Sequence, residues 1–158
     1  MRELILLRHA HAEPASPGQA DIDRPLSPHG LAEAEAAGRW LAAHGLLPDR
    51  VLCSPARRTR ETLEAVLAAT GYAEQRLEES IFEATAGTLI GLLEEQDEVE
   101  RLMLVGHNPG MEQLVALLDS GRSDEYRGMP TAAVAVLSLP SGRPVEPAIA
   151  TLTAFWWP

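Results

Sequence analysis

An arginine and two histidines directly follow a short apolar run near the start of the chain. The run spans residues 4–7, and Arg8, His9 and His11 come after it. A guanidinium binds oxyanions through a fork of N–H donors, and an imidazole that is neutral near pH 7 can act as a nucleophile or a base. Phosphate is the oxyanion whose chemistry uses both groups, so Arg8 and His9 predict a site for a phosphoryl group.

A third histidine, His107, stands in the same sequence context as His9. It follows the apolar run 101–105 and precedes the turn-forming residues Asn108, Pro109 and Gly110. A lone histidine is more often structural, but a position between a strand end and a turn favours a place in a ligand crevice. We therefore expect His9 and His107 to face the same site.

Arg58 is the best candidate for an anion site among three arginines near the start of the second expected helix. Arg57 and Arg60 each precede a glutamate by four residues, so surface ion pairs can match them. Arg58 precedes Thr62 at that spacing and has no carboxylate along its own stripe. An unmatched arginine in the first turns of a helix is unfavourable unless an anion lies nearby. We favour the anion site over an ordinary exposed arginine.

Parallel strands that end at one edge of a sheet would bring these side chains together. An apolar run of four residues is too short for a buried helix and is typical of a central strand covered on both faces. Comparable runs occupy 49–53 and 101–105. In open α/β sheets, ligands bind beyond the carboxyl ends of the strands, and Arg8, His9 and His107 fall at such ends.

Helices and turns between these runs complete an α/β pattern. Ser-Pro or Asn-Pro pairs, each an N-cap followed by proline, are expected to start helices at Ser27, Ser54 and Asn108. A further amphipathic helix is expected around residues 89–93, a short edge strand at 76–77, and a closing hairpin at 133–139 and 148–156. The pattern predicts a three-layer α/β/α fold in which a mostly parallel sheet carries an antiparallel edge strand.

Composition limits the compartment and the partners. The chain has 158 residues, 46% of them hydrophobic, which predicts one domain over residues 1–158. Cys53 is the only cysteine and no export signal opens the sequence, so we expect a cytoplasmic protein without a disulfide. No segment is long enough to cross a bilayer, and a net charge of −10 argues against nucleic acid or membrane partners. Any anion must be bound by a local cluster of cations.

Two guanidiniums and two imidazoles suit phosphoryl transfer through a phosphohistidine, without a metal. One histidine would attack phosphorus in line, while the other cations neutralise the charge on the equatorial oxygens. Three segments also resemble the signatures of the histidine phosphatase superfamily, which includes phosphoglycerate mutase: Leu7-Arg8-His9, Ser54-Pro55-Ala56-Arg57-Arg58 with Thr62, and Gly106-His107. The segments 23–30, 105–110 and 130–133 are similar to the SixA-type phosphohistidine phosphatases, so the likeness covers nearly the whole chain.

The resemblance implies a fold, a mechanism and a class of substrate. It implies a phosphoglycerate mutase-like fold without a lid domain, His9 as the nucleophile, and Arg8, Arg58 and His107 as the phosphate pocket, with no metal or organic cofactor. The implied substrate is phosphohistidine on a signalling or phosphotransfer protein. Much of the superfamily has Gly where this chain has Ala10, and we expect the turn to survive if its backbone is in an ordinary region.

The leaving group is the open question within this fold. Relatives that cleave phosphate esters use a carboxylate to protonate the leaving oxygen, and Glu83 lies in about the right region. A helix-proximal surface glutamate is an equal alternative. The connections 12–25 and 78–100 leave little room for a lid, and an open pocket favours a protein substrate over a small phosphate ester, the other candidate.

Two alternative functions remain open, as does the role of the loop after the first strand. His9, His11 and His107 could ligate a metal in a hydrolase, although Arg8 and Arg58 would crowd the ion; we read His11 as a rim residue. The same fold could also bind phosphate without turnover. Asp21, Asp23 and Arg24 could line the rim, though most such loops are mere connections. The sequence leaves the oligomeric state open, with a monomer slightly favoured.

Overall fold

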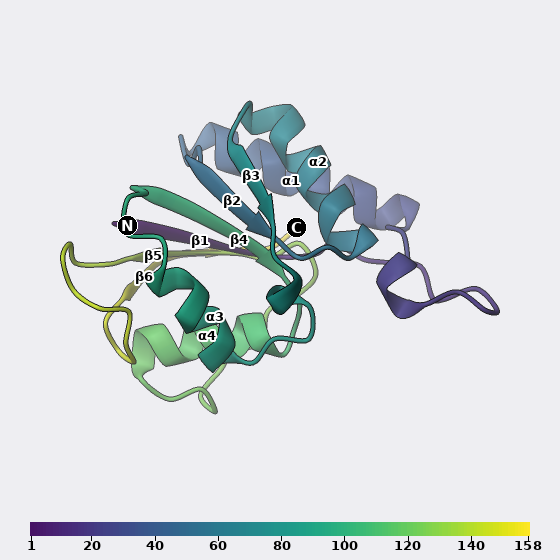
Figure 1. The fold of residues 1–158 in the computed structure, drawn as a ribbon. Helices are drawn as coiled ribbons and strands as arrows, with labels where there is room; N and C mark the ends of the chain where they lie inside the picture. Colours follow the sequence, from purple (N-terminus) through teal and green to yellow (C-terminus); the bar gives the residue numbers. More distant parts are fainter.

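A six-stranded mixed sheet forms the middle layer of the computed structural model, which describes residues 1–158 (Figure 1). Its strands are β1 (Glu3–Arg8), β2 (Arg50–Cys53), β3 (Glu74–Leu77), β4 (Arg101–Gly106), β5 (Val134–Ser138) and β6 (Thr151–Trp156), in the order β3-β2-β4-β1-β5-β6. The first four are parallel, β5 is antiparallel to β1, and β6 is antiparallel to β5. The predicted α/β class is confirmed. The strand that runs against its neighbours is β5, which lies next to the edge strand β6 and not at the edge itself.

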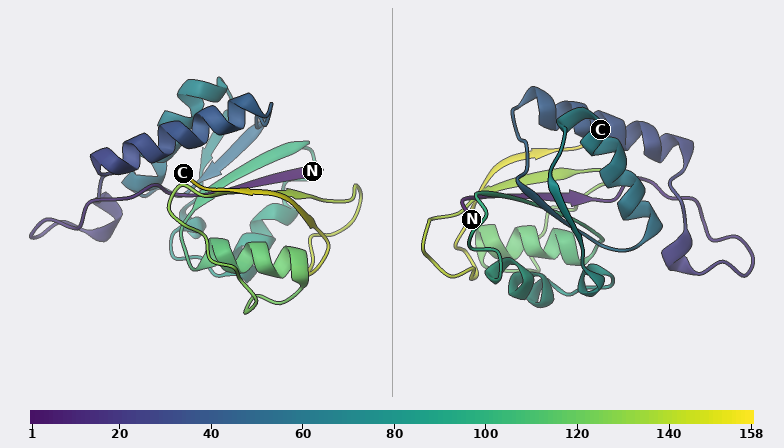
Figure 2. Two further views of the ribbon diagram at one scale, coloured as in Figure 1. Left: turned by 180° about the vertical axis from the view of Figure 1, so that it is seen from behind. Right: turned by 45° about the horizontal axis from the view of Figure 1, so that its top comes forward.

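Two pairs of helices cover the two faces of this sheet (Figures 1 and 2). One face carries α1 (Pro28–Ala43) and α2 (Arg57–Thr70), and the other carries α3 (Ala86–Glu94) and α4 (Gly110–Ser120). Two short 3-10 helices, η1 (Asp21–Asp23) and η2 (Glu79–Ile81), lie in the connections after β1 and β3. The arrangement is the predicted three-layer fold, and it has no lid domain.

The apolar run of β1 serves both faces of the sheet. Leu4, Ile5, Leu6 and Leu7 are fully buried. Because successive side chains of a strand point to opposite faces, Leu4 and Leu6 pack with α3 and α4 while Ile5 and Leu7 pack with α1 and α2. Burying such a side chain contributes about 1.5–3 kcal/mol. This double burial fixes the position of the strand that ends in Arg8.

One of the three predicted helix caps is confirmed and two are wrong. Ser27 Oγ accepts a hydrogen bond from Gly30 N at 2.9 Å, as an N-cap should. The helices expected at Ser54 and Asn108 begin later, at Arg57 and Gly110. The Ser54 hydroxyl lies 2.7 Å from His107 Nε2 and 3.4 Å from the N–H of Ala56, the residue before α2, so its closer contact is with His107.

Strand register brings three chain segments out of the sheet side by side. Arg8 lies opposite Gly106 across β1 and β4, and Cys53 lies opposite Val105 across β2 and β4. Backbone hydrogen bonds continue past the strands, from His9 N to Gly106 O at 3.0 Å and from Ser54 N to Val105 O at 3.1 Å. The residues that follow these strands are therefore held next to one another by the sheet itself.

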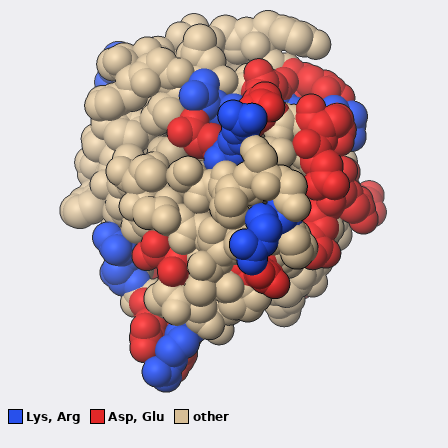
Figure 3. Space-filling view, turned by 90° about the vertical axis from the view of Figure 1, so that its left-hand side faces the viewer, with Lys and Arg blue, Asp and Glu red and all other residues tan.

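The two ends of the sheet differ in shape and in charge. At the carboxyl ends of the parallel strands, the connection 13–24 projects from the body of the molecule and has no buried residue (Figures 1 and 2). At the opposite end, where β1 begins, Asp and Glu side chains form a band with basic side chains beside it (Figure 3). None of the helices combines the length and hydropathy needed to span a bilayer.

Candidate active site

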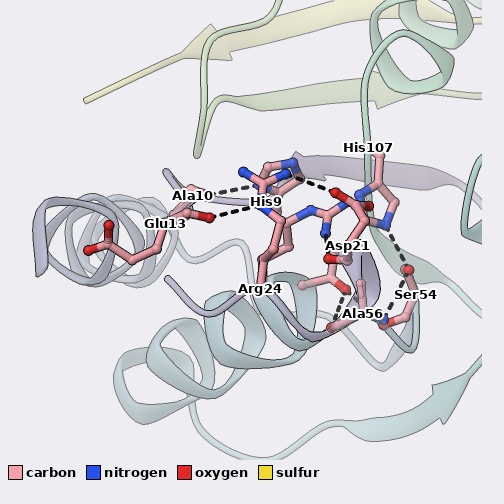
Figure 4. A network of polar contacts seen from close by, with 10 residues as sticks. His9, Ala10, Glu13, Asp21, Arg24, Ser54, Ala56 and His107 are labelled. Atoms are coloured by element: carbon pink, nitrogen blue, oxygen red, sulfur yellow. Dashed lines mark hydrogen bonds and ion pairs between the residues drawn. The ribbon is translucent and has the colours of Figure 1, made fainter. Parts of the chain in front are cut away.

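The two histidines predicted to share a site do so. His9 follows β1 and His107 follows β4, and their ring centroids are 5.3 Å apart (Figure 4). The neighbouring strands supply the rest of the site: Arg8 ends β1, and Ser54 follows β2. Arg58 enters from the first turn of α2. The structure thus brings together all four residues that the sequence singled out for phosphate chemistry.

One nitrogen of His9 is engaged and the other is left for chemistry. Nδ1 lies 2.7 Å from the carbonyl oxygen of Ala10. A carbonyl can only accept, so Nδ1 carries the proton and Nε2 of the neutral ring has a free lone pair. Burial, followed by the charges of Arg58, Arg8 and Arg24, lowers the pKa of His9 to about 4. The ring is therefore uncharged at neutral pH, as a nucleophile must be.

His107 is held between a hydroxyl and an aromatic ring. Its Nε2 lies 2.7 Å from Ser54 Oγ, and the edge of the ring meets Phe82 at a centroid distance of 5.4 Å. Burial lowers the pKa of His107 to about 3, and His9, Arg58 and Arg8 act in the same direction. His107 is thus a neutral, oriented imidazole beside His9.

Arg8 reaches across the sheet edge to the segment before β5. Its Nη1 donates to the carbonyl oxygen of Met129 at 2.9 Å, whereas its Nε is buried without a partner. The Nδ1 atom of His107 is the other buried polar atom without a partner. Buried polar groups without partners lower stability by about 1–3 kcal/mol each. Both of these atoms belong to the site, which is typical of positions arranged for binding and chemistry.

Arg58 has a carboxylate partner that its own helix does not supply. Its Nη1 donates to the backbone oxygen of Asp21 at 2.8 Å, and its Nη2 donates to Asp21 Oδ2 at 3.1 Å. The side chain of Arg58 is 8% exposed and that of Asp21 is 56% exposed. The expectation that Arg58 lacks a carboxylate is therefore wrong for the folded chain, because the partner comes from the connection after β1. The Arg58 guanidinium also lies over the Phe82 ring, 5.9 Å from its centroid.

The other two arginines of α2 point away from this cluster. Arg57 pairs with Glu61 at 3.2 Å, as expected from their spacing. Arg60 does not pair with Glu64; its Nε donates to Pro55 O at 3.0 Å, because the carbonyls at the bend before α2 lie within its reach. Among the three, only Arg58 is buried.

Arg24 adds a further cation that the sequence placed only on the rim. Its Nε donates to Glu13 O at 2.8 Å and its Nη1 to Asp21 Oδ1 at 3.0 Å (Figure 4). Its charge contributes to lowering the pKa of His9, so it lies within electrostatic reach of the His9 ring. Of the three loop residues considered for the rim, Asp21 and Arg24 belong to the site, whereas Asp23 makes no side-chain contact there.

The alanine after the Arg-His pair is accommodated as expected. Ala10 is fully buried and its φ is not positive, so its methyl group causes no backbone strain. It packs with Ala34 and Ala132, and its N–H donates to Thr62 Oγ1 at 3.0 Å. The turn that carries His9 is thereby tied to α2.

Glu83 lies at the mouth of the site rather than inside it. It follows Phe82 directly, is exposed, and has a φ of 59°, which is uncommon for a residue other than glycine. Its carboxylate forms no hydrogen bond or ion pair with the protein. A general acid must reach the leaving oxygen, and an exposed side chain next to Phe82 leaves this role to be tested.

His11 turns away from the other two histidines. Its Nδ1 lies 2.7 Å from Ser27 Oγ, and its ring lies 5.9 Å from that of His29. His9, His11 and His107 therefore do not form a cluster that could hold a metal ion, nor does any other group of three or more His, Cys, Asp or Glu side chains. The ligand set considered for a metal-dependent hydrolase is not assembled.

Sequence reasoning missed the contacts of three residues. The sequence predicts Ser54 as a helix cap and Asp21 as part of a connecting loop, and it gives no functional prediction for Phe82. The sequence held one signal, since Ser54 directly follows a buried strand just as His9 and His107 do. Asp21 could not be found in this way, because its partner Arg58 lies 37 residues away.

A model of the histidine phosphatase superfamily (branch 1) matches residues 4–112, a span that contains Arg8, His9, Arg58 and His107. The chain belongs to this superfamily. Among individual proteins, the chain is similar to Rv1276c of Mycobacterium tuberculosis, with 39% identity over 94% of this chain and 98% of that protein.

Two solved structures place the chain near the SixA group. A structure from Agrobacterium tumefaciens that is assigned as the phosphohistidine phosphatase SixA has 34% identity and a TM-score of 0.87, covering 99% of this chain and 98% of that one. The protein histidine phosphatase SixA complexed with tungstate has the same fold, with a TM-score of 0.84 over 98% of this chain and 96% of that one, at 24% identity.

Proposed function

We propose that this protein removes the phosphoryl group from phosphohistidine on a signalling or phosphotransfer protein, through a phosphohistidine intermediate on His9. The observation that carries the proposal is the state of His9: a neutral ring with Nδ1 bound to Ala10 O and Nε2 free, next to buried Arg58 and to Arg8. A free lone pair among guanidiniums suits attack on a phosphoryl group.

The reaction has two displacements at phosphorus. In the first, the Nε2 lone pair of His9 forms a bond to phosphorus, and the bond from phosphorus to the substrate imidazole breaks. The electron pair of that bond stays on the substrate nitrogen, which takes a proton from solvent. In the second, water attacks phosphorus and gives up a proton to solvent, the bond to His9 breaks with its electron pair returning to Nε2, and inorganic phosphate leaves. Arg8, Arg58 and His107 bind the phosphoryl oxygens, whose charge grows in each transition state.

A protein substrate is favoured by the absence of a lid domain. The connection 13–24 supplies Asp21 and Arg24 to the site but buries none of its own residues, and Glu83 is exposed. A small ester normally needs closure for orientation and exclusion of water, whereas a phosphohistidine on a protein surface can be presented by its own scaffold. The similarity at 34% identity to the structure assigned as SixA supports the same substrate class.

The test compares a histidine peptide phosphorylated with phosphoramidate against p-nitrophenyl phosphate. We expect efficient turnover of the phosphohistidine peptide, and an acid-labile, base-stable label on the enzyme after rapid quenching. His9→Ala should abolish both, whereas His29→Ala, a change at an exposed histidine, should leave both intact. Label on the His9→Ala protein would refute the assignment of the nucleophile, and preference for the ester would refute the assignment of the substrate.

A further inference from the structure

The site of this phosphatase contains an anion of its own. Asp21 belongs to η1, and both of its carboxylate oxygens are bound by arginines of the site: Oδ1 by Arg24 at 3.0 Å and Oδ2 by Arg58 at 3.1 Å (Figure 4). Its backbone oxygen accepts a second hydrogen bond from Arg58 at 2.8 Å. The carboxylate therefore stands among the side chains that would bind the phosphoryl group.

The negative charge on Asp21 persists at neutral pH and reaches the reacting groups. Hydrogen bonds from Arg24 and the charge of Arg58 hold the pKa of Asp21 below its usual range. Its charge also opposes the lowering of the His107 pKa, so it acts on the interior of the site and not only on solvent. Asp23, two residues along, forms no ion pair.

The Asp21 carboxylate is more exposed to solvent than the guanidinium that it binds. The nucleophile follows β1 at the base of the site, and displacement at phosphorus proceeds in line, so the leaving group exits away from His9 toward solvent. The side chain of Asp21 is 56% exposed, whereas that of its partner Arg58 is 8% exposed. The carboxylate thus borders the open side, beyond the buried guanidinium.

We propose that Asp21 is a specificity-determining residue that favours phosphoryl donors with a cationic leaving group over donors with a neutral or anionic one. The inference deepens the proposed function, on which it rests for the identity of the natural substrate. A phosphorylated imidazole that is protonated on its other ring nitrogen carries a positive charge while it is bonded to phosphorus. The ring departs as a neutral imidazole once it takes the electron pair of that bond, and a nearby carboxylate stabilises the positive charge that the ring still carries in the transition state. An alkoxide or phenolate meets repulsion from the same group.

The experiment uses two aryl esters that differ in charge: 4-(aminomethyl)phenyl phosphate, whose leaving group carries an ammonium, and 4-methylphenyl phosphate, which is neutral there. The kcat/KM ratio of the cationic ester to the neutral one is measured for the intact wild-type protein, Asp21→Asn and the matched control Asp23→Asn. We expect the ratio to fall about tenfold in Asp21→Asn, as the loss of one nearby charge predicts, and to stay unchanged in Asp23→Asn. High salt should narrow the difference.

Other outcomes overturn the inference in recognisable ways. An equal loss on both esters would mean that Asp21 only positions Arg58. An equal gain would mean that it only competes with the phosphoryl group for the arginines. The phosphohistidine peptide is assayed alongside: failure of the wild-type protein to hydrolyse it would refute the proposed substrate, whereas an unchanged ester ratio in Asp21→Asn would refute the role of Asp21.

Discussion

At the scale of single residues, the site keeps two histidines neutral by burying them beside positively charged side chains. Burial is the largest cause of the low pKa values of His9 and His107, and the neighbouring guanidiniums add to it. A phosphoryl dianion would cancel much of that positive charge. On the proposed mechanism, the same arrangement keeps His9 neutral before the substrate binds and stabilises the charge that arrives with the phosphoryl group.

Neutral buried histidines make the stability of the fold dependent on pH. The pKa of His9 is about 4 in the folded chain, below its ordinary value of 6.5, so the unfolded chain binds more protons between these pH values. The free energy of unfolding should therefore decrease as the pH falls from 6.5 toward 4. Urea unfolding at pH 7, 6 and 5 would measure this slope, and His9→Asn should make it shallower. Equal slopes would contradict the assignment.

Arg58 should matter for turnover far more than its neighbour Arg57. Arg58 is buried within the site, whereas Arg57 is half-exposed and pairs with Glu61 on the surface. Loss of a charged contact to the transition state costs on the order of 3 kcal/mol, so Arg58→Ala should lower kcat/KM about 100-fold or more. Arg57→Ala should change it by less than about threefold, as expected for a surface pair. Similar losses in both variants would indicate a general basic patch.

At the scale of elements, the strands and their ends could be predicted from the sequence because one local signal specifies them. An apolar run that stops at a polar residue marks both a buried strand and the point where the chain leaves the sheet, and this placed Arg8, His9 and His107 correctly. Helix starts were less predictable because a serine at the end of a strand or loop can either cap a helix or bind another side chain. Ser27 caps α1, whereas Ser54 binds His107 instead.

The contact between Asp21 and Arg58 has no local signal at all. The connection that holds Asp21 has the composition of a plain loop and buries none of the residues 13–24. Only the folded chain brings it over α2, where η1 meets the side chain of Arg58. A spacing rule along one helix cannot report a partner from another element, which is why Arg58 was expected to be unpaired.

Close packing at the start of α1 supports the turn that carries His9. A methyl group at Gly30 would lie 1.9 Å from the backbone oxygen of His11, so α1 can approach that turn only with glycine at this position. Gly30→Ala must push the two apart, and we expect a loss of about 1–3 kcal/mol in the free energy of unfolding together with reduced turnover. Thermal unfolding and a phosphatase assay would measure both.

The matched control is Gly91→Ala, in the middle of α3. Nothing lies within 4 Å of the added methyl group, and the position is exposed. Alanine has a better helix propensity than glycine, so this variant should be more stable by about 0.5–1 kcal/mol and fully active. A Gly30→Ala protein as stable as Gly91→Ala would show that the turn and α1 can separate freely.

At the scale of the whole molecule, the candidate site and a band of acidic side chains lie at opposite ends of the sheet. The chain carries a net charge of −10, and the end opposite the site bears a band of acidic side chains (Figure 3). The cations of the site are therefore a local exception in an acidic protein. Such a site attracts one phosphoryl group at short range without a general affinity for polyanions such as nucleic acid.

A substitution at Glu83 tests whether the protein hydrolyses phosphohistidine or small phosphate esters. An alkyl oxygen leaves as a strongly basic anion unless an acid protonates it, whereas an imidazole nitrogen takes its proton near neutral pH. Glu83 is exposed, directly follows Phe82, and its carboxylate forms no hydrogen bond or ion pair with the site, so we expect Glu83→Gln to leave phosphohistidine hydrolysis nearly intact. Alkyl phosphates should be poor substrates for the wild-type protein and the variant alike.

Assays of both proteins on a phosphohistidine peptide, an alkyl phosphate and an activated aryl phosphate would check this, with Glu79→Gln as a control at an exposed glutamate of η2. A general acid would show itself by a different pattern. Alkyl esters would then be good substrates that slow by roughly 100-fold in Glu83→Gln, while aryl esters, whose leaving groups need less protonation, would slow much less. That result would assign this open fold to the cleavage of small phosphate esters, with a carboxylate at its mouth supplying the proton that phosphohistidine does not require from the enzyme.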